Sequence, residues 1–378
     1  MRENSAALPD VVPAALSTLT DGAVRSTLAA RAEAGTHRII LWLIDGLGYD
    51  QLENALDFDL MPHTASLLAS SAAALRPIRT VFPSITPVAL ASLLTGSWPG
   101  QHGLVGRYLY QSPESPWVDT LGRRAASDTF QLLEPTLDHQ AKRWNVPYQV
   151  IMEEDLRDGA LTRTLHPLTE YISTYVSPLA MEQRLIEAAN ATERGLAYVY
   201  WPYLDAINHL RGPFSRDWAD EMAMLDRIIG SVAAGRSPGG PPVWLWVTAD
   251  HGHQRIRKFL PYWQLRQAMP ELPPIPWGTD RMAAFRLDGD GAQKLRRAAA
   301  QLFGDQVVLR HAADLFESGE LGPAVRAEVR DRLGNWLLET ADGLIWSWDP
   351  GREPHRVANH GGRSPEEMTI PFLEIRLS

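Results

Sequence analysis

The sequence contains no cysteine among its 378 residues. This absence excludes a disulfide framework, a thiolate nucleophile and any zinc site built on sulfur, so a metal site would have to use histidine, aspartate or glutamate. The chain also lacks an apolar run of the about 18 residues that a membrane-spanning helix requires. Residues 1–20 hold no continuous apolar segment of the kind found in secretory signals. We therefore expect a cytoplasmic protein with no membrane attachment.

Positive charge is scarce as well. The 36 lysine and arginine residues stand against 45 aspartate and glutamate residues, which gives a formal net charge of −9. Because phosphate backbones repel an acidic chain, we expect no nucleic-acid partner, sequence-specific or otherwise. An anionic small molecule would need a local source of positive charge. The sequence has no low-complexity tract, which excludes the disordered and fibrous classes.

Short apolar runs alternate with helical patterns along most of the chain. Residues 38–44, 196–201 and 243–247 are rich in apolar, β-favouring residues, which is typical of parallel strands covered on both faces. Strands that alternate with helices indicate βαβ units, so we predict an α/β fold, an α/β/α sandwich around a mainly parallel sheet. Further predicted strands are 78–82, 148–152, 307–309 and 343–348, and the predicted helices are 62–74, 87–94, 215–229, 291–302 and 323–338.

No internal repeat or linker divides the chain, so we predict one domain over residues 1–378. Residues 111–176 depart from the alternating pattern because they mix tryptophan, proline and polar residues. Ligands of open α/β sheets bind beyond the carboxyl ends of the strands. We expect residues 111–176 to form an inserted, cap-like segment at the rim of such a site.

Side chains of the metal-binding types gather just beyond the predicted strands. Taken singly, each has a simpler explanation as a turn residue, a helix cap or a surface pair. Their joint appearance at the carboxyl ends of strands indicates one shared site, with enough hard or borderline ligands for two divalent cations. These candidate ligands are Asp45, Asp205, His209, Asp250, His251 and His360.

Thr86 stands where a predicted strand gives way to a helix, in the segment FPSITP at 82–87. The free N–H groups and the dipole of a helix N-terminus attract anions, so a phosphoryl group attacked by Thr86 would meet partial positive charge there. The simpler interpretation is that Thr86 caps the helix that follows.

Five motifs, in order along the chain, carry a resemblance to a known family. They are LIDGLGYD at 43–50, FPSITPVALASLLTGSWPGQHGLVG at 82–106, YLDAINHLRGP at 203–213, TADHGH at 248–253 and NHGG at 359–362. With these motifs the sequence resembles the type I phosphodiesterases, or nucleotide pyrophosphatase/phosphodiesterases, of the alkaline phosphatase superfamily. The second motif is long and specific, and together the motifs span most of the chain.

The resemblance implies a site with two metal ions, most often zinc, and a small-molecule phosphate ester or nucleotide as substrate. Thr86 would attack phosphorus to give a covalent phosphothreonine, which water then hydrolyses. No oligomeric state follows from it. By resemblance the first metal would be bound by Asp205, His209 and His360, and the second by Asp45, Thr86, Asp250 and His251.

Two positions depart from the family pattern. Arg107 stands where nucleotide pyrophosphatases carry an asparagine that binds the phosphate, and His253 stands where a methionine is common. If Arg107 reaches the phosphoryl oxygens, it is a catalytic residue that supports a dianionic monoester as well as a diester. The alternative is that Arg107 faces solvent or pairs with a carboxylate.

Three other functions are weighed against a phosphodiesterase or pyrophosphatase. A phosphomonoesterase or a phosphonate hydrolase would use the same site and is suggested by Arg107. A sulfatase is disfavoured because its formylglycine precursor is cysteine or serine, whereas Thr86 holds the nucleophile position. A noncatalytic metal-dependent binding protein is disfavoured because both Thr86 and the full ligand set are present. His102 and His355 are expected to be loop residues.

Overall fold

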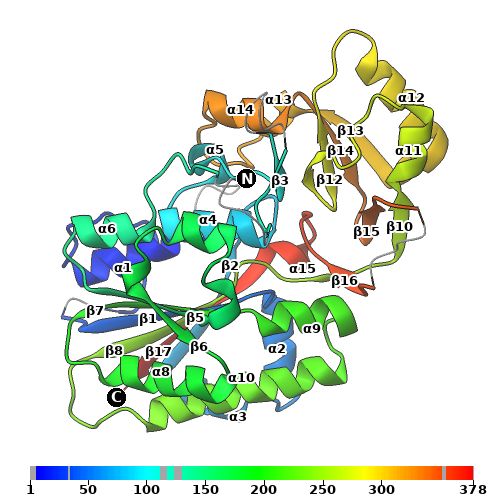
Figure 1. Ribbon diagram of the computed structural model, residues 1–378. Coiled ribbons are helices and arrows are strands. Elements are labelled where there is room, and N and C mark those ends of the chain that lie inside the picture. Colours follow the sequence, from blue (N-terminus) through cyan, green and yellow to red (C-terminus); the bar gives the residue numbers. More distant parts are fainter. Residues whose placement is uncertain (1–5, 33–34, 111–116, 123–129, 351–354, 378) are drawn as a thin grey trace.

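Seven strands form the central sheet of the structure (Figure 1). They are β1 (Arg38–Ile44), β2 (Ala73–Arg79), β5 (Tyr148–Glu153), β6 (Ile172–Tyr175), β7 (Gly195–Trp201), β8 (Val243–Thr248) and β17 (Thr369–Leu377). Their spatial order is β2-β17-β8-β1-β7-β5-β6, and only β17 runs antiparallel to its neighbours. The computed structural model describes residues 6–32, 35–110, 117–122, 130–350 and 355–377.

The middle of this sheet is the main hydrophobic core. Every residue of β1 and of β8 is buried, as expected for strands that are covered on both faces. In the register of the sheet, Ile40 lies between Ala197 of β7 and Leu245 of β8. The rings of Trp42 and Trp201 pack edge to face with centroids 6.2 Å apart. This core fixes the carboxyl ends of three neighbouring strands at one edge.

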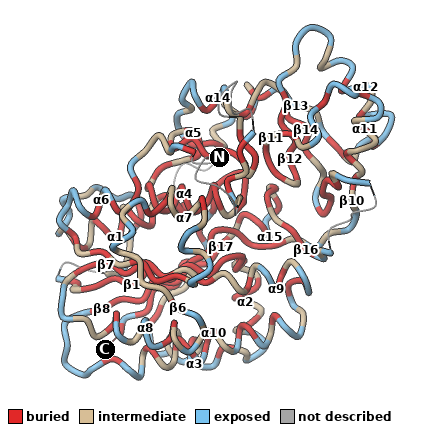
Figure 2. Tube along the Cα trace, viewed as in Figure 1, coloured by how far each residue is buried: buried red, intermediate tan, exposed pale blue. Residues whose placement is uncertain are grey.

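Helices cover both faces of the sheet, so the predicted α/β/α sandwich is confirmed. Figure 1 shows α1 (Val11–Leu19) and α4 (Thr86–Thr95) on one face, with α3 (Pro62–Ala69), α8 (Pro178–Asn190) and α10 (Arg216–Ala234) on the other. The buried tube in Figure 2 runs through the strands between these two layers. No helix of the described ranges is long and apolar enough to cross a bilayer.

A second sheet lies beside the first and has its own core. Its six strands are all antiparallel, in the order β13-β14-β12-β11-β3-β4. The helices α11 (Tyr262–Ala268) and α12 (Gly291–Phe303) pack on it through a separate apolar cluster that includes Phe285, Phe303 and Trp346. The strands are β3 (Tyr108–Leu109), β4 (Val118–Asp119), β11 (Trp277–Thr279), β12 (Met282–Phe285), β13 (Val307–His311) and β14 (Trp336–Thr340).

Two predicted helices are wrong at their carboxyl ends. The helix predicted over 62–74 ends at Ala69, and the chain enters β2 at Ala73, where Pro77 is tolerated because β2 is an edge strand. The helix predicted over 323–338 is only α14 (Ala327–Leu333), and β14 begins at Trp336. In both places a strand pairs with a distant partner, and this pairing overrides the local helical pattern.

The segment 111–176 divides between the two sheets. Strand β4 joins the second sheet, whereas β5 and β6 extend the central sheet. The helix α7 (Ala160–Leu165) lines a cavity that Thr86 also lines, so this part of the segment does lie beside the candidate site. Residues 111–116 and 123–129 lie outside the described residues. The division of the chain into domains stays a prediction.

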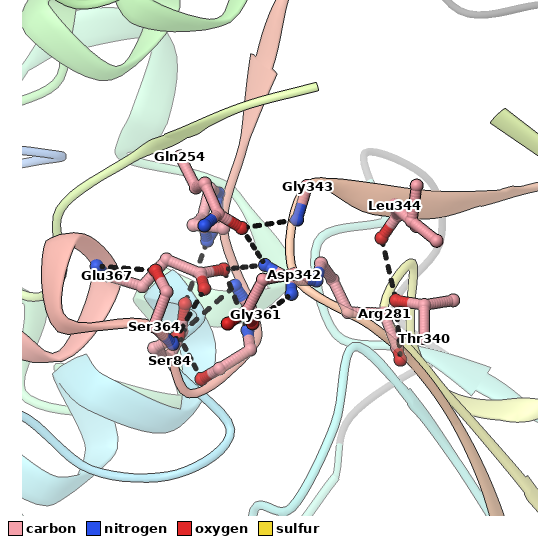
Figure 3. Close-up of polar contacts among 12 residues, drawn as sticks. Ser84, Gln254, Arg281, Thr340, Asp342, Gly343, Leu344, Gly361, Ser364 and Glu367 are labelled. Atoms are coloured by element: carbon pink, nitrogen blue, oxygen red, sulfur yellow. Dashed lines mark hydrogen bonds and ion pairs between the residues drawn. The ribbon is translucent and has the colours of Figure 1, made fainter. Parts of the chain in front are cut away.

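A buried polar network ties the second sheet to the loop that follows β16 (Ala358–Asn359) (Figure 3). The Glu367 carboxylate accepts from the Nη1 of Arg281 at 2.6 Å and from the backbone N–H groups of Gly362 and Ser364 at 2.9 and 3.1 Å. Arg281 also donates to Asp342, at the end of the second sheet, at 3.1 Å. Glu367 is therefore both a charge partner and a loop anchor.

Replacing Glu367 by alanine is expected to destabilise the fold by about 3–5 kcal/mol, because it leaves the buried Arg281 without its closest charge partner. Urea unfolding of the wild type and the variant measures this loss. The exposed neighbour Glu366 provides the matched control, and Glu366→Ala is expected to change stability by less than about 0.5 kcal/mol. Equal losses in the two variants would contradict the assignment.

Candidate metal centre and nucleophile

Three neighbouring strands of the central sheet, β8, β1 and β7, lead into the acidic residues of the candidate site. Asp45 directly follows β1, Asp250 lies two residues after β8, and Asp205 lies in the first turn of α9 (Tyr203–Arg211), just after β7. The carboxyl ends of parallel strands meet at one edge of a sheet. The fold therefore brings together three carboxylates that are far apart in sequence.

The first cluster of potential ligands surrounds the carboxylate of Asp205. The Oδ1 of Asp205 lies 3.4 Å from the Nε2 of His209, 3.2 Å from that of His253 and 3.6 Å from that of His360. His209 is four residues beyond Asp205 on α9, so the two side chains share a face of the helix. The four residues could together hold one metal ion.

Backbone carbonyl groups orient the histidine rings of this cluster. The Nδ1 of His209 contacts the carbonyl oxygen of Ala358 at 2.9 Å, and that of His360 contacts the carbonyl oxygen of Ser84 at 2.9 Å. A carbonyl oxygen only accepts, so each Nδ1 carries the proton and each Nε2 keeps its lone pair. A hydrogen bond from Nδ1 to a carbonyl group fixes the ring and its tautomer, and so prepares the Nε2 for metal binding.

The second cluster lies against the first and shares Asp205 with it. Ligand atoms of Asp45, Asp205 and His251 lie within 4.8 Å of one another. The Nε2 of His251 is 3.1 Å from the Oδ2 of Asp250 and 3.6 Å from the Oδ1 of Asp45. In the described part of the chain, neither of these carboxylate oxygens has a hydrogen-bond partner. Buried, unsatisfied oxygens of this kind suit a cation.

Burial and neighbouring charges shift the pKa values of the carboxyl groups and imidazoles in these clusters, and the direction differs from group to group. Burial, together with Asp250 and Asp205, raises the pKa of Asp45 well above its usual range. Although burial acts against it, the surrounding histidines hold the pKa of Asp205 well below its usual range. Burial lowers the pKa of His209 to about 4 and that of His360 well below its usual value. The two imidazoles are therefore neutral at pH 7, which is the form that binds metals.

Thr86 is not the cap of its helix. The N-cap of α4 is Ile85, whose side chain makes no capping hydrogen bond, and Thr86 occupies the first helical turn together with Pro87. Its Oγ1 lies 3.2 Å from the Nε2 of His251. The hydroxyl thus faces the second cluster while the N-terminus of α4 points at the same place. This position suits a nucleophile that attacks an anionic centre.

Arg107 lies in the same cavity as Thr86 but is already paired. Its Nε and Nη2 each donate to a carboxylate oxygen of Asp119 at 3.1 Å. The cavity, of about 150 Å³, is lined by Thr86, Arg107 and Arg356 together with residues of the first cluster. Arg356 in turn lies 3.5 Å from the carboxylate of Asp280. Each of these two arginines is therefore already paired with a carboxylate.

The structure brings all of the sequence-predicted candidates to this edge of the sheet, and it adds three residues that sequence reasoning missed as site residues. His253 joins the first cluster, whereas Arg356 and Asn359 line the cavity. Asn359 is buried, and its Nδ2 has no hydrogen-bond partner within the described ranges. The sequence signal for Asn359 is its place in the NHGG motif, whereas Arg356 is marked only by its closeness to His360.

The two histidines expected to be loop residues lie elsewhere. The imidazole of His102 is buried against Ser92, with its Nε2 2.8 Å from the serine Oγ, and its Nδ1 accepts from the backbone N–H of Leu104 at 3.1 Å. Burial lowers the pKa of His102 to about 3, which keeps it neutral. His355 is exposed. Neither belongs to a metal-binding cluster of the described residues.

Comparison with known proteins gives a family match for most of the chain. A model of the type I phosphodiesterase / nucleotide pyrophosphatase family matches residues 39–300, which leaves only the NHGG motif at 359–362 outside the match. This family is generally dependent on a dinuclear metal centre. No curated protein sequence matches the chain significantly.

Solved structures share the fold at low sequence identity. Murine ectonucleotide pyrophosphatase / phosphodiesterase 5 is 17% identical with a TM-score of 0.69, over 89% of this chain and 87% of its own. An inactive threonine-to-alanine variant of that protein, in complex with AMP, is 16% identical with a TM-score of 0.67, again over 89% of this chain and 87% of its own. Phosphonoacetate hydrolase from Sinorhizobium meliloti, in complex with phosphonoformate, is 18% identical with a TM-score of 0.66, over 92% of each chain.

Removal of metal ions is expected to lower the stability of the folded protein, because the carboxylates of Asp45, Asp205 and Asp250 would then lie together without a cation. Zinc at about 1,000 times its dissociation constant would restore about 4 kcal/mol. Thermal unfolding with a chelator, and after zinc is added back, measures this difference. Asp205→Asn should lose most of the zinc response, since Asp205 belongs to both clusters. A wild-type protein that is indifferent to chelator would contradict the metal centre.

Proposed function

The chain belongs to the type I phosphodiesterase / nucleotide pyrophosphatase family, and from this premise we propose that it cleaves phosphodiester or phosphoanhydride bonds through a covalent phosphothreonine. It is a phosphoric ester hydrolase. The observation that carries the proposal is the place of Thr86: its hydroxyl lies 3.2 Å from the Nε2 of His251, at the N-terminus of α4 and beside both clusters. The inactive threonine-to-alanine variant of the murine structural relative supports the same role.

The donor atoms of the two clusters fit a pair of divalent cations. Imidazole and carboxylate ligands without sulfur suit zinc, which we propose as the bound ion. Asp205, His209 and His360 would hold one ion, and Asp45, Asp250 and His251, with the Thr86 hydroxyl, would hold the other. When bound, the cations would lower the pKa of the Thr86 hydroxyl and offset the negative charge of the transition state.

The reaction that follows has two displacements at phosphorus. The Oγ1 of Thr86 loses its proton and bonds to phosphorus, while the bond from phosphorus to the leaving oxygen breaks and that oxygen takes up a proton. Water then attacks phosphorus, the bond to Oγ1 breaks, and the Thr86 hydroxyl is restored. The N–H groups at the start of α4 stabilise the charge on the phosphoryl oxygens in both steps.

The cavities on either side of Thr86 support a substrate with two ester groups. One is the polar cavity that Arg107 and Asn359 line. The Nδ2 of Asn359 has no hydrogen-bond partner among the described residues, so it is a ready donor for a phosphoryl oxygen. The other is also about 150 Å³ and is lined by apolar side chains that include Leu90 and Leu161. Thr86 lines both cavities, so a phosphodiester bound there could place one ester group in each, whereas a simple monoester has only one ester group to place.

The charges in the polar cavity also favour a diester. A phosphodiester carries one negative charge and a monoester carries up to two. Arg107 is paired with Asp119, and Arg356 with Asp280, so the two arginines add little net positive charge. The alternative, a phosphomonoesterase or phosphonate hydrolase, would require one arginine to leave its carboxylate. The fold that the chain shares with phosphonoacetate hydrolase supports this alternative function.

Replacing Thr86 by alanine is expected to reduce hydrolysis of a nitrophenyl phosphodiester by several orders of magnitude, toward the about 10⁶-fold loss seen when a covalent nucleophile is removed. Steady-state rates with the zinc-loaded enzyme measure this effect, and Thr86→Ser should retain part of the activity. Acid quench with mass spectrometry should trap a phosphate on Thr86. Full turnover by Thr86→Ala would refute the mechanism.

Freeing Arg107 is expected to shift the substrate preference. In Asp119→Asn the guanidinium of Arg107 no longer faces a carboxylate, so the ratio of monoester to diester turnover should rise about tenfold or more, the worth of a charged hydrogen bond. Rates on nitrophenyl phosphate and on a nitrophenyl nucleotide diester give this ratio. Arg107→Met serves as the control and should lower the ratio or leave it unchanged. An unchanged ratio in Asp119→Asn would show that Arg107 does not meet the phosphoryl group.

A further inference from the structure

We propose that His253 is a fourth protein ligand of the metal ion held by Asp205, His209 and His360. The inference rests on the proposed function because it takes the first cluster to be an ion site. It goes further in that it assigns a closed shell of four protein ligands to that ion. The proposed mechanism gives His253 no role.

The spacing of the ligand atoms carries the proposal. Two atoms that each lie about 2.0–2.1 Å from a tetrahedral zinc ion are roughly 3.3 Å apart. The Oδ1 of Asp205 is 3.2 Å from the Nε2 of His253, and it is 3.4 and 3.6 Å from those of His209 and His360. His253 is therefore placed at least as well for a shared ion as the two histidines already assigned.

The contact between His253 and Asp205 has the form expected of two ligands that share a cation. The Nε2 of His253 and the Oδ1 of Asp205 are both buried, and within the described chain neither makes a hydrogen bond. The Nδ1 of His253 faces the carbonyl oxygen of Gly46 at 3.4 Å. Since a carbonyl only accepts, this contact places the proton on Nδ1 and leaves a lone pair on Nε2, pointed at a carboxylate oxygen. A metal ion between the two atoms satisfies both.

The surrounding chain holds the His253 ring in this position. A side chain at Gly46 would bring its Cβ to 2.8 Å from the Cε1 of His253, and Gly46 has a φ of +79°. The turn after Asp45 thus leaves space that the imidazole occupies. The ring is 2% exposed and packs edge to face against His209 with centroids 4.8 Å apart. His253 therefore needs no rearrangement to reach the cluster.

A zinc ion with four protein ligands has a different role from a zinc ion with three. Zinc sites with four protein ligands are usually structural and bind their ion without help from solvent, whereas three ligands leave a position open for water or substrate. With His253 as a ligand, the ion of the first cluster is retained in the resting enzyme.

The decisive experiment is a crystal structure of the zinc-loaded wild-type enzyme with anomalous diffraction at the zinc edge. We expect an ion in the first cluster at about 2.0–2.1 Å from the Nε2 of His253 and equally close to its other three ligands. An ion bound by Asp205, His209 and His360, with His253 beyond bonding distance, would overturn this assignment and leave the proposed function standing. A cluster that holds no ion would overturn both.

Zinc affinity in solution provides a second readout that does not depend on activity. Competition with a chromophoric chelator should show at least a tenfold loss at one of two sites in His253→Gln, since even an outer-shell partner is worth that much. His355→Gln removes an exposed histidine and is the matched control, with wild-type affinity expected at both sites. Wild-type affinity in His253→Gln would also overturn the assignment. The crystal distances, rather than the affinity, separate a ligand from a residue that only orients Asp205.

Discussion

Mutual repulsion among clustered carboxylates is the constraint on which the rest of this structure depends. Asp45, Asp205 and Asp250 lie just beyond the ends of adjacent strands. Asp45 and Asp250 are buried and Asp205 is partly exposed, and in the described part of the chain each has a buried oxygen without a hydrogen bond. Such a group is costly unless positive charge is supplied. The acidic composition of the chain provides no general excess of cations, and the nearby arginines are already paired. The arrangement is therefore one that binding of divalent cations completes.

The second sheet contributes to this centre without supplying a metal ligand. Its Arg281 pairs with Glu367, and Glu367 holds the backbone of the loop that carries His360. From the other side, the hydroxyl of Ser84, two residues before Thr86, donates to the carbonyl oxygen of Gly362 at 2.9 Å. The nucleophile and the last histidine are thus held relative to each other through a few buried polar contacts. The buried contacts between the two sheets therefore affect the geometry of the candidate site.

The parts of the molecule that could be predicted from sequence are those with a strong local signal. β1 can be predicted to the residue because six of its seven residues are apolar and Asp45-Gly46 follows directly. The candidate ligands followed from the same rule, that ligands collect beyond parallel strands. β14 was missed because its residues continue a helical pattern, and only pairing with β12 and β13 makes them a strand. His253 was noticed as a departure from the family pattern, but its place beside Asp205 depends on the turn at Gly46, which no local pattern reveals.

The antiparallel strand β17 bears on how the chain reaches this structure. It lies between β8 and β2, so β2 cannot join the sheet until β17 has been made, although some 290 residues separate them. Until then β8 presents an open edge of unpaired backbone groups, the kind of surface that promotes association between chains. Pairings over such long sequence separations are slow to form. The sheet is therefore completed late, and an incompletely synthesised chain is the form most exposed to aggregation and most in need of chaperones.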